Sequence, residues 1–406
     1  MSAKYPAESG ELILVLNCGS SSIKFALFDT AGHAPPRRPS WGGRVQGIGG
    51  GADAEFVETG GAPVALALDA AKPYHAALER IRERVGARRD GRRVAAVAHR
   101  VVHGGSKYMA PARVDAGVLA DLKGYIPLAP LHQPFALEAI DVLLREQPEL
   151  PQVACFDTAF HHTLPRVERM LPLPRAAWER GLRRYGFHGL SYAYMAVALA
   201  QRHGDAARGR TIVAHLGSGA SLCAMQGLQS VATTMGFSAL DGLMMGTRCG
   251  ALDPGAVLYL MEIEQLTLAQ LAHLLYRESG LLGVSGLSAD TRVLLEREAQ
   301  DEGARDALAL FVRRMAREIG ALVAVLGGLD MLVFTAGIGE NSAEIRRRTC
   351  AQLGFLGVLL DEAANGRHAR VISTADSAVI VGVEPTNEEW MVASQAMPLL
   401  SPRGPA

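Results

Sequence analysis

The stretches ILVLNCGSSSIKFALFD (13–29) and TIVAHLGSGASLCAMQG (211–227) decide the fold of this chain. Each is an apolar run, a short turn of glycine and serine, and a second apolar run, which is the pattern of two strands joined by a turn. One such match is common in unrelated proteins. Two copies roughly 200 residues apart indicate an internal repeat, so we expect two similar domains that face one another.

The rest of the chain alternates between strand and helix patterns. Further apolar runs predict strands at 94–98, 152–156, 211–214, 331–335 and 378–383. Helical periods predict helices at 74–85, 190–203 and 302–326, the last ending at Gly327 and Gly328. The stretch 30–63 is rich in glycine and proline and predicts loops with short edge strands. This alternation is typical of an α/β protein with mainly parallel or mixed sheets.

Composition excludes several classes of protein. The chain has 406 residues, of which 49% are hydrophobic, so it is neither disordered nor fibrous. Lys plus Arg and Asp plus Glu both total 41, and this balance gives no electrostatic reason to expect nucleic acid or an anionic membrane. No apolar run reaches the ~20 residues that span a bilayer. The first residues lack the apolar core of a secretory signal, and the five cysteines form no C-x-x-C pair, so we expect a multi-domain protein of the reducing cytoplasm.

The first Gly-Ser turn, from Asn17 to Lys24, is a candidate site for an anion. Glycine and serine let backbone N–H groups approach an anion, and Lys24 adds a positive charge. The turn does not have the spacing of a Walker A loop. The structural alternative is a hairpin turn whose serines bind their own backbone.

Two charged residues follow apolar strands in the first half of the chain. Arg100 lies in AHRVVHGG (98–105), and Asp157 lies in CFDTAFHH (155–162). Ligands of open α/β sheets usually bind at the carboxyl ends of strands, and the planar guanidinium suits carboxylate or phosphate. Alternatively, Asp157 caps the following turn. His99 and His103 are four residues apart, but the adjacent glycines argue against the helix that a metal pair at this spacing needs.

Two further motifs place basic side chains beside glycines. His188 lies in YGFHG (185–189), ahead of a predicted helix, where an imidazole can stabilise charge or carry a proton. Arg248 lies in GTRCG (246–250), after the apolar run GLMM. The alternatives are a structural histidine and a surface arginine.

The last two motifs follow the last two apolar runs. TAGIGEN (335–341) precedes a helix that we expect to begin near Ser342, and backbone amides at such a start bind phosphate or the edge of a nucleotide. The third glycine of a dinucleotide fingerprint is absent. PTNEE (385–389) is either a helix start with acidic residues in its first turn or a carboxylate directed at a metal.

Taken together and in this order, the motifs resemble the acetate kinase family, a branch of the superfamily that includes sugar kinases, Hsp70 chaperones and actin. LVLNCGSSSIK and AHRVVHGG resemble its two signature patterns, and the other motifs resemble further blocks over nearly the whole chain. The resemblance implies an α/β fold of two duplicated actin-like (ribonuclease H-like) domains with a cleft between them. It implies an N-terminal domain at 1–155, completed by 385–406, and a C-terminal nucleotide-binding domain at 156–384.

The resemblance also implies the reaction and its partners. The activity would be reversible, ATP-dependent phosphorylation of acetate to acetyl phosphate, with ATP and ADP as co-substrates, Mg²⁺ (or Mn²⁺) as the metal, and a homodimer as the assembly. Propionate and butyrate kinases share the same motifs and are the alternative within enzymes. A non-enzymatic clamp like Hsp70 or actin is the alternative outside them, although it has no need of Arg100, His188 and Arg248 together.

By matching motif positions, the resemblance assigns roles to individual residues. Asn17 and Glu388 would hold the metal, and Arg100 and Arg248 would hold the carboxylate and the transferring phosphoryl group. His188 would stabilise the transition state and Asp157 would be the catalytic acidic group. An apolar pocket for the methyl group would be formed by Val102, Leu131 and Phe187. The nucleotide would be bound by Lys24, His215, Leu216, Gly217, Ser218, Gly219, Asp290, Thr291, Arg292, Gly337, Ile338, Gly339, Glu340 and Asn341.

The chain departs from the family pattern without losing a charged catalytic group. Ser218 replaces an asparagine, Gln133 another asparagine and Ala251 an acidic residue. Ala239 occupies the position of a proline expected in the acid pocket. We therefore expect activity to be retained.

Overall fold

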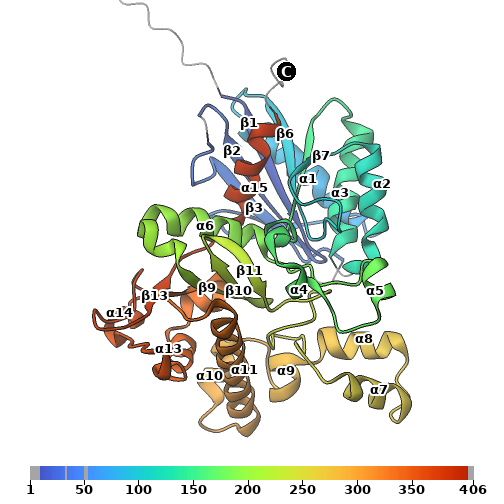
Figure 1. Ribbon diagram of the computed structural model, residues 1–406. Coiled ribbons are helices and arrows are strands. Elements are labelled where there is room, and N and C mark those ends of the chain that lie inside the picture. The colour runs from blue at the N-terminus through green and yellow to red at the C-terminus, as the bar shows by residue number, and fades with distance from the viewer. Residues whose placement is uncertain (1–9, 33, 50–53, 131, 401–406) are drawn as a thin grey trace, which may run out of the picture. The chain divides into compact units, whose positions relative to one another are not determined.

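A computed structural model describes residues 10–32, 34–49, 54–130 and 132–400. The chain divides into two compact units. Unit 1 comprises Met1–Ala159 with Asn387–Ala406, and unit 2 comprises Phe160–Thr386. Each unit is built on one sheet, with helices packed against it (Figure 1). The prediction of an α/β fold with two sheets is confirmed.

The sheet of unit 1 has the order β5-β4-β3-β2-β1-β6-β8-β7 within the described residues. Its strands are β1 (Leu12–Cys18), β2 (Ser22–Asp29), β3 (Trp41–Gln46), β4 (Ala54–Glu58), β5 (Val64–Leu66), β6 (Val94–Val101), β7 (Ala112–Arg113) and β8 (Gln152–Phe156). Its helices are α1 (Pro73–Arg88), α2 (Ala116–Gly124), α3 (Gln133–Glu146) and α15 (Glu388–Ala396). β1, β6 and β8 are parallel neighbours, so their carboxyl ends share one edge of the sheet.

The sheet of unit 2 has the order β11-β10-β9-β12-β13 within the described residues. Its strands are β9 (Arg210–Leu216), β10 (Ala220–Gln226), β11 (Gln229–Thr233), β12 (Met331–Thr335) and β13 (Ile380–Val383). Its helices are α4 (Arg166–Arg169), α5 (Arg175–Glu179), α6 (Gly189–His203), α7 (Pro254–Glu262), α8 (Leu268–Arg277), α9 (Gly280–Ser285), α10 (Thr291–Arg297), α11 (Glu302–Leu326), α12 (Ala336–Asn341), α13 (Ala343–Ala351) and α14 (Glu362–Gly366).

The two sheets repeat the same topology. In each, an antiparallel hairpin (β1–β2 and β9–β10) is followed by two parallel strands (β6, β8 and β12, β13). The third strand, β3 or β11, pairs with the outer side of the hairpin. The repeat in the sequence therefore corresponds to a repeat of strand order. The turn after β1 in unit 1 and the turn after β9 in unit 2 occupy the same place in their sheets.

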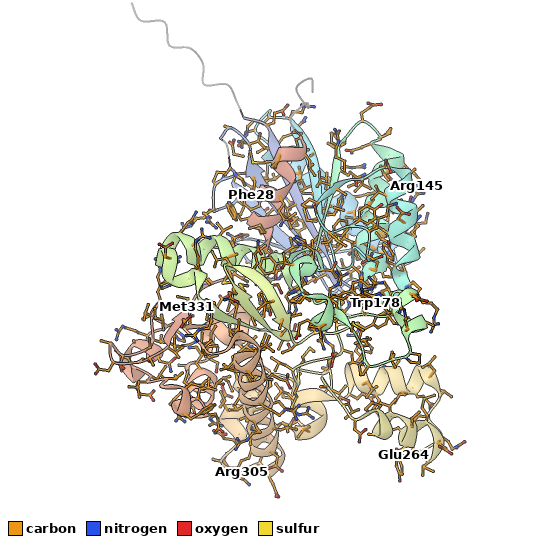
Figure 2. All side chains as sticks on the ribbon, in the orientation of Figure 1. Phe28, Arg145, Trp178, Glu264, Arg305 and Met331 are labelled. Atoms are coloured by element: carbon orange, nitrogen blue, oxygen red, sulfur yellow. The ribbon has the colours of Figure 1, made fainter. Side chains whose placement is uncertain are left out.

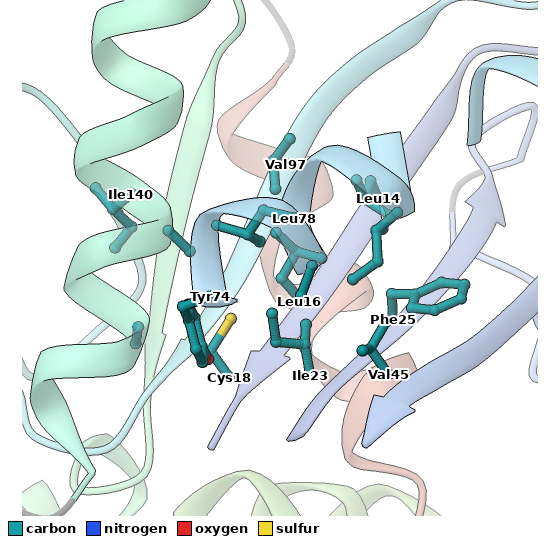
Figure 3. Packing of buried hydrophobic residues seen from close by; sticks show 14 of the residues in the cluster. Leu14, Leu16, Cys18, Ile23, Phe25, Val45, Tyr74, Leu78, Val97 and Ile140 are labelled. Carbon is teal, nitrogen blue, oxygen red and sulfur yellow. The ribbon is translucent and has the colours of Figure 1, made fainter. Parts of the chain in front are cut away.

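The core of unit 1 follows from the alternation of side chains along β1. Leu12, Leu14 and Leu16 pack in one apolar cluster with Leu78 and Ile140 from the helices α1 and α3 (Figure 3). Ile13 and Val15 are equally buried but point to the other face. α15 packs against β1, β2, β6 and β8. Burial on both faces explains the uninterrupted apolar run.

The stretch 30–63 differs from its prediction. It contains β3 and β4, which lie inside the strand order, while β5 forms the sheet edge. Glycine in β3 has a packing reason, because a Cβ on Gly43 would collide with the carbonyl oxygen of Val57 in β4. The glycines that predict a loop here instead allow neighbouring strands to approach closely.

Candidate active site

The parallel strands of unit 1 bring Asn17, Arg100 and Asp157 together at their carboxyl ends. The Nε of Arg100 lies 3.2 Å and 3.1 Å from the two carboxylate oxygens of Asp157, and its Nη2 donates to Oδ2 at 2.7 Å. Its Nη1 donates to Oδ1 of Asn17 at 3.2 Å. Arg100 is thus held by a two-pronged ion pair, which fixes the plane of the guanidinium.

Glu388 joins this cluster from the first turn of α15. Its Oε2 lies 3.8 Å from Nη1 of Arg100. The side chain of Asn387 caps the helix, accepting from the N–H of Trp390 at 3.0 Å and donating to the carbonyl of Arg37 at 2.8 Å. The cap therefore fixes where α15 begins and where Glu388 is presented.

Electrostatics favour the charged form of Arg100. Burial alone would lower the pKa of Arg100, but the charge of Asp157 and then that of Glu388 outweigh burial and raise it. The side chain of Arg100 is 22% exposed and that of Asp157 only 2% exposed. The guanidinium is a fixed cation with one accessible side, as a site for a carboxylate or phosphoryl oxygen requires.

Lys24 lies beside this cluster on the neighbouring strand. It is opposite Asn17 in the antiparallel register of β1 and β2, and its side chain is exposed. A hollow of about 550 Å³ adjoins it, and Asn387 and Glu389 contribute to its wall. Lys24 is thus an accessible cation next to Asn17.

In unit 2, His188, His215 and Arg248 gather over the turn between β9 and β10. A Cβ on Gly219 would lie 2.6 Å from Nη2 of Arg248 and 3.3 Å from Nε2 of His188. The rings of His188 and His215 are stacked with their centroids 4.1 Å apart. A side chain at this turn would therefore displace Arg248, because two basic side chains occupy the space above the backbone of Gly219.

Two serines orient the histidine rings. Nδ1 of His188 lies 2.8 Å from the hydroxyl of Ser221, and Nδ1 of His215 lies 2.9 Å from that of Ser191. His188 has a left-handed backbone with φ 57°, directly before α6. The strained position and the serine contact together set the direction of Nε2.

Arg248 is held by a loop, and none of the ion pairs among the described residues involves it. Its Nη1 donates to the carbonyl oxygen of Ala239 at 2.6 Å. Burial lowers the pKa of Arg248. A half-buried guanidinium bound to a backbone carbonyl retains unsatisfied charge, so an incoming anion would stabilise it.

The motif TAGIGEN folds into a short helix of its own rather than a loop. The prediction of a helix near Ser342 is confirmed by α13, which Ser342 caps, but Ala336–Asn341 is already the short helix α12. Oε1 of Glu340 accepts from the N–H groups of Ala336 at 2.8 Å and Thr386 at 3.0 Å. Its side chain holds the turn together, while Gly337 is exposed, and a Cβ added there would meet no described atom within 4 Å.

The other expected nucleotide residues lie at separate places of unit 2. His215 and Leu216 end β9, and Gly217, Ser218 and Gly219 form the turn after it. Asp290 caps α10, in which Thr291 is buried, and its carboxylate pairs with the side chain of Arg292 at 2.6 Å. Ile338 is half-buried in α12, and Asn341 donates to the carbonyl of Gly337 at 2.9 Å.

The residues expected around the methyl group of the acid come from both units. Val102 follows β6 in unit 1 and is half-buried, and Phe187 is buried before α6 in unit 2. Leu131 lies outside the described residues. Gln133, one of the departures from the family pattern, binds both backbone groups of His103, so it stabilises the loop after β6.

Sequence reasoning missed Ser191 and Ser221. Both hydroxyls contact an imidazole, yet neither stands in a motif that marks it, because the histidines they orient are 24 and 33 residues away. The hydroxyl of Ser221 also lies 2.5 Å from the hydroxyl of Tyr192, which is part of α6. Only the pairing of α6 with β9 and β10 reveals these contacts.

The oxygen donors of unit 1 fit a magnesium ion. No group of three or more His, Cys, Asp or Glu side chains able to hold a metal occurs among the described residues. The amide oxygen of Asn17 and the carboxylate of Glu388 both lie within 4 Å of Nη1 of Arg100, so they belong to one cluster. Mg²⁺ typically takes one or two protein oxygens and completes its shell with water and phosphate, which suits this donor set.

The helices that the structure describes include none with the length and apolar character needed to cross a membrane.

Comparisons with known proteins show which proteins this chain is similar to. An acetate kinase of Rhodopseudomonas palustris is 49% identical over 387 residues, covering 94% of this chain and 97% of that protein. The crystal structure of Porphyromonas gingivalis acetate kinase matches with a TM-score of 0.86 and 36% identity over 96% of this chain and all of that one. A propionate kinase of Francisella tularensis matches with a TM-score of 0.87 and 34% identity over 95% of this chain and 98% of that one.

The match extends to the family as a whole. A family model described as the acetokinase family matches residues 12–394. This range includes each of the motifs that carry the resemblance, so that resemblance is confirmed. The chain belongs to the acetokinase family.

Proposed function

We propose that this chain catalyses reversible transfer of the γ-phosphoryl group of ATP to the carboxylate of acetate, forming acetyl phosphate and ADP. The observation that carries the proposal is the fixed cation at the strand ends of unit 1, where Asp157 and Asn17 hold Arg100. Such a guanidinium binds a short carboxylate and stabilises negative charge on a transferring phosphoryl group.

The residues of unit 1 bind the acid and the phosphates. Arg100 holds the carboxylate. Val102 and Leu131, together with Phe187 of unit 2, surround the methyl group. Lys24 reaches the phosphates of the nucleotide. Asn17 and Glu388 hold Mg²⁺, which when bound neutralises phosphate charge.

The residues of unit 2 stabilise the transition state and bind the nucleotide. His188 and Arg248, which meet over Gly219, donate to the equatorial oxygens of the phosphoryl group in transit. In-line transfer depends on such donors more than on covalent chemistry. The nucleotide is bound by His215, Leu216, Gly217, Ser218, Gly219, Asp290, Thr291, Arg292, Gly337, Ile338, Gly339, Glu340 and Asn341.

Asp157 acts by position rather than as a base. Acetate is already ionised at neutral pH, so no proton has to be removed before it attacks phosphorus. The buried carboxylate of Asp157 orients Arg100 through three contacts. Its contribution is the alignment of the acid with the phosphoryl group.

A coupled assay of ADP formation tests the function, with a control lacking acetate. We expect acetate-dependent turnover that falls about a hundredfold in Arg100→Ala and Arg248→Ala, since one lost transition-state donor typically costs about 3 kcal/mol. Arg180→Ala, an exposed arginine of unit 2, is the matched control and retains activity. Wild-type turnover in either site variant at saturating substrates contradicts the assignment, and ATP hydrolysis independent of acid favours a nucleotide clamp.

Use of propionate beside acetate is the second candidate function, and Ala239 is the residue that favours it. Alanine leaves more room than the proline expected there, and one methylene in an apolar pocket is worth about 1–3 kcal/mol. Its carbonyl also binds Arg248, so the loop is part of the site. We expect acetate to remain a substrate, with propionate close behind.

Ala239→Pro tests whether alanine at this position lets propionate react nearly as well as acetate. The variant is expected to raise the ratio of kcat/KM for acetate over propionate, measured together with butyrate on both proteins. An unchanged ratio contradicts the pocket argument and leaves the kinase assignment intact, because Arg248 binds the backbone of residue 239 and not its side chain.

We further propose a cytoplasmic homodimer. All five cysteines lie in the described part and are free thiols, as in a reducing compartment. Leu258, Ile263 and Leu268 of the α7–α8 region are each at least 60% exposed, which offers an apolar surface to a second copy. Sedimentation velocity tests the assembly, and a species of monomer mass alone contradicts it.

A further inference from the structure

The segment from Arg166 to Arg184 in unit 2 carries an excess of positive charge. It contains six arginines and two glutamates. Arg184 donates to the carbonyl oxygens of residues 233–235 and is structural. Arg175 pairs with Glu179, one of the two glutamates of the segment.

Three of these arginines surround one indole ring. The guanidinium carbons of Arg183, Arg166 and Arg169 lie 4.1, 5.4 and 6.0 Å from the ring centroid of Trp178, on α5. Figure 2 marks Trp178 on this part of the chain. Since a ring has two faces, at least two of the three guanidinium groups share one face.

No acidic side chain of the described residues forms an ion pair with Arg166, Arg169 or Arg183. The side chain of Arg183 donates through Nη2 to the carbonyl oxygen of Trp178 at 3.0 Å. The Nε of Arg183 is buried and has no hydrogen-bond partner in that part of the chain. A buried guanidinium donor without an acceptor is costly, so the cluster lacks an anionic component.

We propose that Arg166, Arg169 and Arg183 form a binding site for a phosphate-type oxyanion beside Trp178. A tetrahedral dianion has enough oxygens to accept from two or three guanidinium groups at once, and arginine is well suited to such forked contacts. The indole holds the guanidinium groups by cation–π contact and limits their freedom before the anion arrives. The pKa of Arg169 is lowered by burial and next by the charge of Arg183, as expected for like charges held together without a counter-ion.

The three arginines are not among the catalytic residues proposed above, and the proposed site does not depend on kinase activity. Its ligand is either inorganic phosphate or a phosphate monoester, which share the same dianionic group. Arg184 at the end of this segment donates to the carbonyl oxygen of Met235, so the segment is tied to the backbone that precedes Phe237 and Ala239.

Fluorescence of Trp178 gives a direct test. The native protein is titrated with potassium phosphate and, separately, with glycerol 3-phosphate, at ionic strength kept constant with potassium chloride. Isothermal titration calorimetry provides a second measurement that does not depend on the indole. We expect a saturable change at millimolar ligand, and the tighter of the two ligands identifies the source.

The variants decide where the anion binds. Arg166→Gln/Arg169→Gln should weaken binding at least tenfold, with at most a small loss of thermal stability and with basal kinase activity retained. Each side chain loses its contact with the Trp178 ring, and neither has an ion pair to lose among the described residues. Arg175→Gln/Arg180→Gln removes the same charge from the same segment outside the ring cluster and should bind as the native protein does. Trp178→Phe should lose the change in fluorescence that the ligand causes and should keep the heat of binding measured by calorimetry. Equal binding in the two double variants, or a change matched by potassium chloride alone, overturns the site.

Discussion

Two histidines of unit 2 show at the scale of single residues how a hydroxyl contact can serve different ends. Nδ1 of His188 lies 2.8 Å from Ser221, and Nδ1 of His161 lies 2.8 Å from Ser230. The second nitrogen of His161 is 2.9 Å from the carbonyl of Phe187, so that ring is satisfied inside the fold. The second nitrogen of His188 instead approaches the turn at Gly219 beside Arg248.

Ser221→Ala separates these roles. Loss of the contact leaves the His188 ring less well oriented, and we expect kcat to fall about tenfold, the equivalent of about 1.4 kcal/mol, with little change in KM for ATP. Ser230→Ala is the matched control, because it removes the same kind of contact from His161 and should lower stability more than kcat. Equal losses of kcat in the two variants would show that Ser221 has only a structural role.

At the scale of elements, the hairpin and the strand–helix turn define where ligands can lie. β9–β10 places Gly219 under His188 and Arg248, and β12–α12 leaves Gly337 exposed at its surface. The buried Arg346 supports this second turn from below, donating to the carbonyls of Gly339 and Glu340 at 2.8 and 2.9 Å. The turn is therefore rigid without help from a nucleotide.

Gly337→Leu tests whether a nucleotide lies on α12. The first atom of a side chain here meets no described protein atom, so stability should be retained, but the side chain would occupy the space assigned to adenosine. We expect KM for ATP to rise at least tenfold and KM for acetate to change little.

Gly320→Leu is the control for this prediction, because Gly320 is also helical and has equal room around it. If KM for ATP is the same in both variants, the nucleotide lies elsewhere. Activity supported by pyrophosphate and not by ATP would contradict the choice of phosphoryl donor.

At the scale of the whole molecule, buried neutral histidines set the stability at acid pH. Burial lowers the pKa of His99, His103 and His161 to about 4 each. The pKa of a histidine in the unfolded chain is near 6.5. Between about pH 6.5 and 4 these histidines are therefore protonated in the unfolded chain and neutral in the folded units. The contribution of these histidines to stability is therefore fully present above about pH 6.5 and is lost as the pH falls towards 4, by roughly 3 kcal/mol per histidine.

Urea unfolding between pH 7.5 and 4.5, values chosen to bracket roughly that window, measures this dependence. His99→Gln should make the free energy of unfolding less dependent on pH, although it loses stability at neutral pH. His273→Gln, at a side chain that is 63% exposed, should leave the dependence unchanged. A pH profile that is equally steep in all three proteins would contradict the assignment to buried histidines.

Much of the fold follows from sequence patterns alone. The helix predicted at 302–326 is α11, Glu302–Leu326, and it ends at Gly327 with φ 72°. Periodicity and a glycine cap are local properties, so they need no knowledge of distant contacts. The repeat of Gly-Ser turns likewise predicts two related hairpins, and the motifs in order predict the family.

Tertiary structure alone decided which groups meet. Arg100 is 83 residues from Asn17 and 57 from Asp157, and the parallel pairing of β1, β6 and β8 brings them together. The same holds for Ser221 beside His188, which are 33 residues apart. Local propensity fixes the elements because it depends on neighbours in the chain. Contacts across a sheet depend on the register and packing of strands far apart in sequence, which no local pattern encodes.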